Sequence, residues 1–133
     1  MRRMILSAAL LAAMLVGLWG RPAHAGCTMQ EVCQDVMDSA SLTVIDGGGV
    51  EINSVTWSSD SENGNLSMYK VVRTDDPFDP NGTWVVVETV DPTGTCGTEE
   101  GYEVHEPAPE GEWTYAIQVY RAGVGLSCMI VIE

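Results

Sequence analysis

Hydrophobic and polar positions divide the chain into three parts with different periodicities. Residues 4–20 form an uncharged, largely apolar run. Residues 28–38 carry apolar side chains at the i, i+3, i+4, i+7 and i+8 spacing of one helix face. From residue 41 onward, short β-rich runs alternate with turn-forming segments. The pattern therefore predicts a leading apolar segment, one short helix and a domain built from strands.

The leading segment has the organisation of a secretory signal peptide. Arg2 and Arg3 precede the apolar run, and Ala23 and Ala25 follow it in an A-x-A cleavage pattern. A permanent membrane anchor is one alternative, but the run is at the short end for crossing a bilayer. We expect residues 1–25 to be removed and the protein to be secreted, extracellular or periplasmic.

A lipoprotein signal is a second alternative, because Cys27 follows two small residues. His24, however, stands where such signals normally carry an aliphatic residue. No membrane contact is expected unless Cys27 is lipidated.

The predicted helix lies in a cysteine-bearing segment, residues 26–40. Thr28 and Glu31 have the spacing of a capping box at its start. Its apolar face consists of Met29, Val32, Cys33, Val36 and Met37.

Residues 41–133 are expected to form one all-β domain, a seven-stranded antiparallel β-sandwich, because strands and turns recur at regular spacing. Trp57, Trp84, Trp113 and Phe78 are the expected bulky members of a thin core. The strands are expected at 41–45, 50–57, 66–74, 84–90, 102–106, 113–120 and 126–133.

Charge narrows the range of partners. The chain has 6 basic and 19 acidic residues, and removal of residues 1–25 leaves only Lys70, Arg73 and Arg121 as basic side chains. Nucleic acids and anionic membranes need a basic surface, so neither is an expected partner. The acidity is explained by solubility, by a divalent cation or by a basic partner.

From residue 41 onward the chain resembles a fibronectin type III domain, an immunoglobulin-like sandwich. The resemblance lies in VTWSSD (55–60), YKVVRT (69–74) and GEWTYAIQVYRAGVGLS (111–127). Trp113 stands where the family usually has a corner tyrosine, so either its indole N–H replaces the tyrosine hydroxyl or the corner is absent. The family topology implies that the segment before the first strand and segments 58–65, 91–101 and 121–125 share one end of the sandwich.

Four cysteines in an exported domain predict two disulfides, and they show no C-x-x-C spacing typical of zinc sites. The resemblance implies that Cys27, Cys33, Cys96 and Cys128 cluster at that shared end. It favours Cys96–Cys128 with Cys27–Cys33, and pairings that tie the helix to the sandwich are the alternative.

No catalytic constellation is evident, so the protein is not expected to be an enzyme. His105 is the only histidine beyond the signal peptide and is expected to be a solvated strand residue. The motifs of serine hydrolases, zinc proteases and phosphate-binding loops are absent from the sequence.

Three loops, 58–65, 75–82 and 121–125, remain as candidate sites. Segment 75–82 has the composition of a calcium loop, with Asp75, Asp76, Asp79 and Asn81 as ligands, although its register does not match an EF-hand. The loops at the shared end are expected to bind a partner through Asp60, Glu62, Asn63 and Arg121.

The favoured hypothesis is a non-enzymatic module that binds a protein or glycan. The alternatives are a calcium-stabilised structural domain of the cell envelope and a small hydrolase that uses acidic residues.

Overall fold

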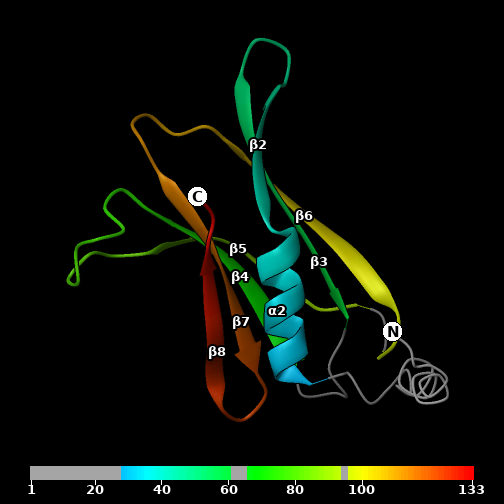
Figure 1. The fold of residues 1–133 in the computed structure, drawn as a ribbon. Coiled ribbons are helices and arrows are strands. Elements are labelled where there is room, and N and C mark those ends of the chain that lie inside the picture. Colours follow the sequence, from blue (N-terminus) through cyan, green and yellow to red (C-terminus); the bar gives the residue numbers. More distant parts are fainter. Residues whose placement is uncertain (1–27, 61–65, 94–95) are drawn as a thin grey trace, which may run out of the picture.

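The computed structural model describes residues 28–60, 66–93 and 96–133, so the predicted signal peptide lies outside the described residues. One helix and seven strands follow in chain order (Figure 1). They are α2 (Met29–Ser39), β2 (Ser41–Asp46), β3 (Glu51–Asp60), β4 (Leu66–Thr74), β5 (Val85–Val90), β6 (Glu99–Pro107), β7 (Thr114–Arg121) and β8 (Gly125–Val131).

The strands form two antiparallel sheets, in the orders β2-β3-β6 and β5-β4-β7-β8. The predicted β-sandwich with seven strands and one preceding helix is confirmed. The predicted strand positions hold to within a few residues, because alternating apolar residues and intervening Gly and Pro residues mark them locally.

The core lies between the sheets around three aromatic rings. The rings of Trp57, Tyr69 and Tyr102 have centroids 4.9–5.4 Å apart, which is contact distance for aromatic pairs. The prediction that Phe78 belongs to the core is wrong, because its side chain is 91% exposed on the loop between β4 and β5. That loop contains Pro77 and Pro80, which keep the segment out of the sheet.

Trp113 forms the corner that precedes β7. Its indole N–H donates a 2.8 Å hydrogen bond to the backbone carbonyl of Glu110. The guanidinium carbon of Arg73 lies 4.4 Å from the centre of the indole ring. The indole N–H therefore ties the start of β7 to the preceding loop, which agrees with the first of the two alternatives for this position.

Helix α2 fills the lower part of the open side between the sheets, where Figure 1 shows it between β3 and β8. Thr28 caps the helix by accepting a 3.2 Å hydrogen bond from the Glu31 N–H, as the capping pattern predicted. Met29, Val32 and Val36 are buried in the core. The apolar face of the helix thus completes a core that the two sheets alone would leave open.

In the described part of the chain, no helix covers the upper part of the open side between the two sheets. Every residue of β2 is exposed, and the hairpin between β2 and β3 projects beyond the rest of the molecule (Figure 1). Gly48 and Gly49 form its turn with φ angles of 84° and 96°, which only glycine adopts readily. The inner side chains of β2 consequently stay open to solvent, with Leu42 37% and Val44 56% exposed.

Candidate functional site

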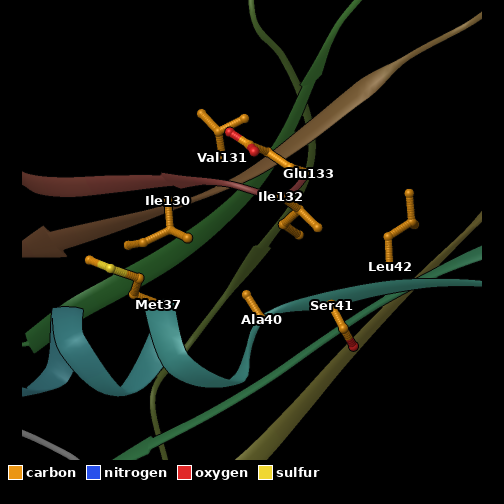
Figure 2. A pocket seen from close by; sticks show the side chains of 8 residues that line it. All are labelled: Met37, Ala40, Ser41, Leu42, Ile130, Val131, Ile132 and Glu133. Carbon is orange, nitrogen blue, oxygen red and sulfur yellow. The ribbon is translucent and has the colours of Figure 1, made fainter.

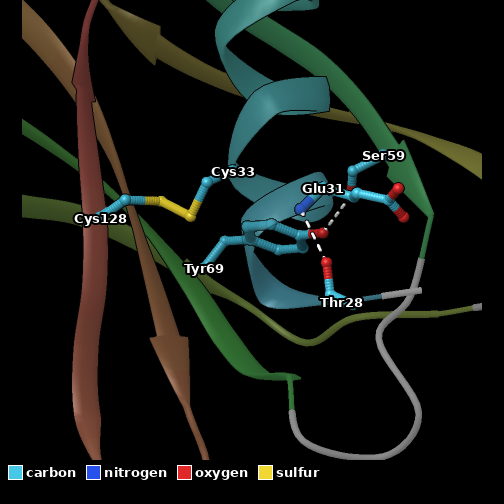
Figure 3. The surroundings of a disulfide bond; sticks show 6 residues. All are labelled: Thr28, Glu31, Cys33, Ser59, Tyr69 and Cys128. Atoms are coloured by element: carbon cyan, nitrogen blue, oxygen red, sulfur yellow. Dashed lines mark hydrogen bonds between the residues drawn. A yellow bond between two sulfur atoms is a disulfide. The ribbon is translucent and has the colours of Figure 1, made fainter. Parts of the chain in front are cut away.

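A disulfide joins Cys33 on α2 to Cys128 on β8, across 95 residues of sequence (Figure 3). The favoured pairing of Cys96 with Cys128 and Cys27 with Cys33 is therefore wrong. Val32 and Val36 point from α2 into the core, and Cys33, the residue after Val32, packs beside them and reaches Cys128 on β8. The pairing follows from this docking, which the spacing of the cysteines in the sequence does not indicate.

Cys96 is also disulfide-bonded. It lies just before β6, at the end of the sandwich where β3 ends and β7 turns into β8. Cys27 lies outside the described residues.

A polar cluster lies between the sheets, above the aromatic core. The Arg73 Nε–H lies 2.9 Å and 3.0 Å from the two carboxylate oxygens of Glu106. The hydroxyl of Tyr115 donates a 2.6 Å hydrogen bond to the same carboxylate and accepts one of 2.8 Å from the Asn53 amide. Burial, with the hydrogen bond to Glu106, raises the pKa of Tyr115 to about 12. Each polar group therefore has a partner, and the cluster ties four strands together.

His105, Glu103 and Ser54 lie together on the outer face of the β2-β3-β6 sheet. The Glu103 carboxylate accepts a 3.0 Å hydrogen bond from the Ser54 hydroxyl and lies 2.6 Å from His105 Nε2. The hydrogen bond with His105 lowers the pKa of Glu103. A serine nucleophile needs histidine next to its hydroxyl, whereas here a carboxylate stands between the two. The arrangement agrees with the expected solvated strand histidine.

The predicted calcium loop uses two of its carboxylates to shape its own backbone. Asp76 Oδ1 accepts a hydrogen bond from the Phe78 N–H, and Asp79 Oδ1 accepts one from the Asn81 N–H. Such contacts stabilise turns without any ion. Within the described ranges, no group of three His, Cys, Asp or Glu side chains is arranged to hold a metal. Calcium binding through Asp75, Asp76, Asp79 and Asn81 stays a prediction.

Two of the predicted partner-binding residues, Asp60 and Arg121, lie at one end of the sandwich but in separate sheets. Asp60 ends β3, and Arg121 ends β7 in the other sheet, while Glu62 and Asn63 lie outside the described residues. Asp60 instead donates its backbone N–H to the carboxylate of Asp35 on α2, at 3.2 Å. Burial, and then the nearby carboxylates of Asp60, Glu99 and Glu31, raise the pKa of Asp35.

The surface has a groove beside α2 that we call the seam. It opens between the end of α2, the start of β2 and the end of β8, with a volume of about 350 Å³ (Figure 2). Met37, on the face expected to be buried, is 58% exposed here. The seam is lined by Met37, Ala40, Ser41, Leu42, Ile130, Val131, Ile132 and Glu133.

A second hollow, of about 380 Å³, lies at the opposite end of β2. It contains the aliphatic side chains of Val44, Ile45 and Val50 together with Asp46 and Glu51. Both hollows thus combine aliphatic walls with carboxylates and are connected by the exposed strand β2.

Sequence reasoning missed the seam because its residues fit ordinary core positions. Leu42 and Val44 alternate with polar residues as a buried strand requires. The one available signal was that β2 lacks the lysines and prolines that commonly protect an edge strand.

Comparison with known proteins gives no relative: no family model, curated protein or solved structure matches the chain. In the described part of the chain, no helix is long and apolar enough to cross a membrane.

Proposed function

We propose that this protein is an exported, non-enzymatic binding module of the fibronectin type III type and that its partner is a protein. The observation that carries the proposal is the exposed apolar surface formed by the seam and β2. Exposed apolar side chains that lie together mark interaction sites more often than isolated ones do.

The order of the strands supports the proposed family. A three-stranded sheet of the first, second and fifth strands facing a four-stranded sheet is the arrangement expected for such a domain. Trp57, Tyr69, Val71 and Tyr115 lie on inner faces, where the resemblance places them. A disulfide and the signal-like sequence of residues 1–25 are both consistent with export.

The absence of an evident reactive arrangement supports a binding role over catalysis. Among the described residues, the arginine, tyrosine and glutamate of the interior cluster are hydrogen-bonded to each other rather than open to a substrate. The buried Ser54 hydroxyl and the exposed His105 are separated by the carboxylate of Glu103. Neither cluster lines the seam.

The lining of the seam favours a protein over a glycan. A sugar needs many hydrogen-bond donors and acceptors to replace the water around its hydroxyl groups. Among the described side chains that line the seam, Ser41 and Glu133 are polar and the others are apolar. Aliphatic walls instead suit the apolar side chains of a protein segment.

A display selection with random peptides tests the proposal. The target is the full chain, expressed for export and purified from the exported fraction. We expect selected peptides whose binding is lost in Leu42→Glu, which puts a charge in the seam, and kept in Thr56→Glu. Thr56 lies on the outer face of the same sheet, where its hydroxyl contacts Ser41.

Both variants must keep the melting temperature near that of the parent protein for the comparison to count. Failure to select any peptide, or selection of peptides whose binding is indifferent to Leu42→Glu, would contradict a protein-binding seam.

A further inference from the structure

We propose that β2 receives an extended segment of a basic partner protein, which adds to its free edge as a further strand. The inference rests on the proposed function and states the chemistry of the partner. It follows from the hydrogen-bonding pattern of β2, from the lack of edge protection, and from the charges of the two hollows beside the strand.

The free edge of β2 presents a regular set of backbone groups. Among the described strands, β2 pairs with β3 alone, in unbroken antiparallel register from Ser41 to Asp46. At the turn, Gly47 donates its N–H to the carbonyl of Val50 at 2.7 Å, so Gly47 and Val50 are a hydrogen-bonded pair. Because hydrogen-bonded and non-hydrogen-bonded pairs alternate along an antiparallel ladder, every second residue of β2 before Gly47 is hydrogen-bonded to β3. The N–H and C=O groups of Leu42, Val44 and Asp46 therefore point away from β3.

Natural edge strands are usually protected against pairing with other chains. Lysine, proline, a bulge or a covering loop commonly provides this protection. Residues 41–46 contain neither lysine nor proline, the register is continuous, and all six residues are exposed. Val44, in the middle of the strand, is 56% exposed. An edge of this kind is suited to strand addition.

An added strand would direct alternate side chains towards the inner side of β2. The seam lies on that side near Leu42, and the second hollow lies near Val44. Backbone hydrogen bonds would then provide the attachment, while the two hollows would select side chains at fixed positions along the segment.

The charges of the side chains that line the two hollows indicate which kind of partner segment fits them. The acids of the hollows are Glu133 in the seam and Asp46 and Glu51 in the other. None of the described residues that line the two hollows is basic. A lysine or arginine can lay its aliphatic stem on such walls and bring its charge to a carboxylate. The partner segment should therefore carry basic residues near its ends and aliphatic residues between them.

A second copy of this chain is a poor occupant, because two of its basic residues, Lys70 and Arg73, already have partners. Lys70 lies over the ring of Tyr120, with its Nζ 4.8 Å from the ring centre. Arg73 is held by Glu106 inside the sandwich. Two copies joined through β2 would bring their acidic hollows together, and like charges oppose such contacts.

The test uses defined peptides and amide hydrogen exchange of the exported full chain. The probe is a capped peptide of alternating valine and threonine with lysine at both ends; its control carries glutamate at the ends. We expect the lysine peptide to bind about tenfold more tightly than the glutamate peptide. It should slow exchange of the Leu42, Val44 and Asp46 amides and leave Lys70 unchanged.

Val44→Pro and Val44→Thr form the matched pair of variants. Proline removes the N–H at the free edge without breaking a bond to β3, whereas threonine keeps both the N–H and the branched shape. We expect Val44→Pro to weaken peptide binding by roughly tenfold or more, and Val44→Thr to keep most of it. If Val44→Pro does not fold, the exchange measurement on the parent protein still decides the question.

Several results would overturn strand addition. One is unchanged hydrogen exchange at the amides of Leu42, Val44 and Asp46 when the lysine peptide is added. Another is equal binding of the lysine and glutamate peptides. A third is a dimer that sedimentation detects in the absence of peptide and that neither peptide dissociates. If display selection still yields peptides sensitive to Leu42→Glu, the binding module stands and only strand addition fails. If it yields none, the proposed function fails with it.

Discussion

Arg73 and Glu106 face each other between the two sheets, with the Arg73 Nε–H 2.9 Å from one carboxylate oxygen and 3.0 Å from the other. Their side chains are only 18% and 16% exposed. Each residue comes from an inner position of its strand, β4 and β6, so the pair links the two sheets directly.

Removal of the Glu106 charge should destabilise the fold. In Glu106→Gln the guanidinium of Arg73 stays in place with a weaker partner, so we expect a loss of about 2 kcal/mol in the free energy of unfolding. Urea denaturation measures this loss. Glu112→Gln removes an exposed carboxylate nearby and should change stability by less than about 0.5 kcal/mol. Equal effects of the two variants would show that the pair contributes little.

The disulfide between Cys33 and Cys128 should contribute strongly to stability because it closes a long loop. For a loop near 95 residues the loss in Cys33→Ser with Cys128→Ser should be about 4 kcal/mol, measured by denaturation. Peptide mapping of the oxidised parent should find Cys33 joined to Cys128, and then Cys96 joined to Cys27, the remaining cysteine of the sequence. Fragments joining Cys96 to Cys128 would contradict the structure.

We expect two aromatic replacements of Trp113 to change the stability of the protein by different amounts. Trp113→Phe keeps a ring beside Arg73 but loses the hydrogen bond to the Glu110 carbonyl, so we expect a loss of about 1 kcal/mol. Trp113→Tyr supplies a hydroxyl, the group that the resemblance places at this corner, and should recover part of that loss. Thermal denaturation of both variants gives the comparison, and equal stabilities would argue against a corner hydrogen bond.

Asp35 should make stability depend on pH in a defined direction. Its pKa lies above the ordinary value of 3.8 in the folded protein, mainly because the carboxyl is partly buried. The folded protein therefore keeps this proton at pH values where the unfolded chain has released it, and the contribution to stability falls as pH rises through that window. Asp35→Asn should remove this decline and raise stability at neutral pH. Asp38→Asn, on the exposed side of α2, is the control.

The loop at residues 75–82 should respond to mutation without involving calcium. Asp76 and Asp79 already hold backbone N–H groups, so Asp79→Ala should lower the melting temperature by a similar amount with and without added calcium. Differential scanning calorimetry in calcium and in chelator measures both. A calcium-dependent rise in the melting temperature of the parent, lost in Asp79→Ala, would instead establish the calcium loop.

The fold could be predicted closely because its signals are local. The capping pair Thr28 and Glu31 marks the start of the helix, and alternation in residues such as Tyr115 and Ile117 marks inner strand positions. The candidate site could not be predicted in this way. Met37 and Leu42 have the pattern of core residues, and their exposure depends on which segment covers them.

The sequence by itself determined the helix, the strands, the acidic charge and the expectation of disulfides, because each depends on residues close together in the chain or on composition. Only the tertiary structure decided that Cys33 meets Cys128, that Arg73 meets Glu106, and that β2 and the seam stay open. These three depend on how α2 docks and on how far the sheets separate above it. Periodicity shows which face of an element is apolar, but the element that covers that face is chosen by packing across the whole domain.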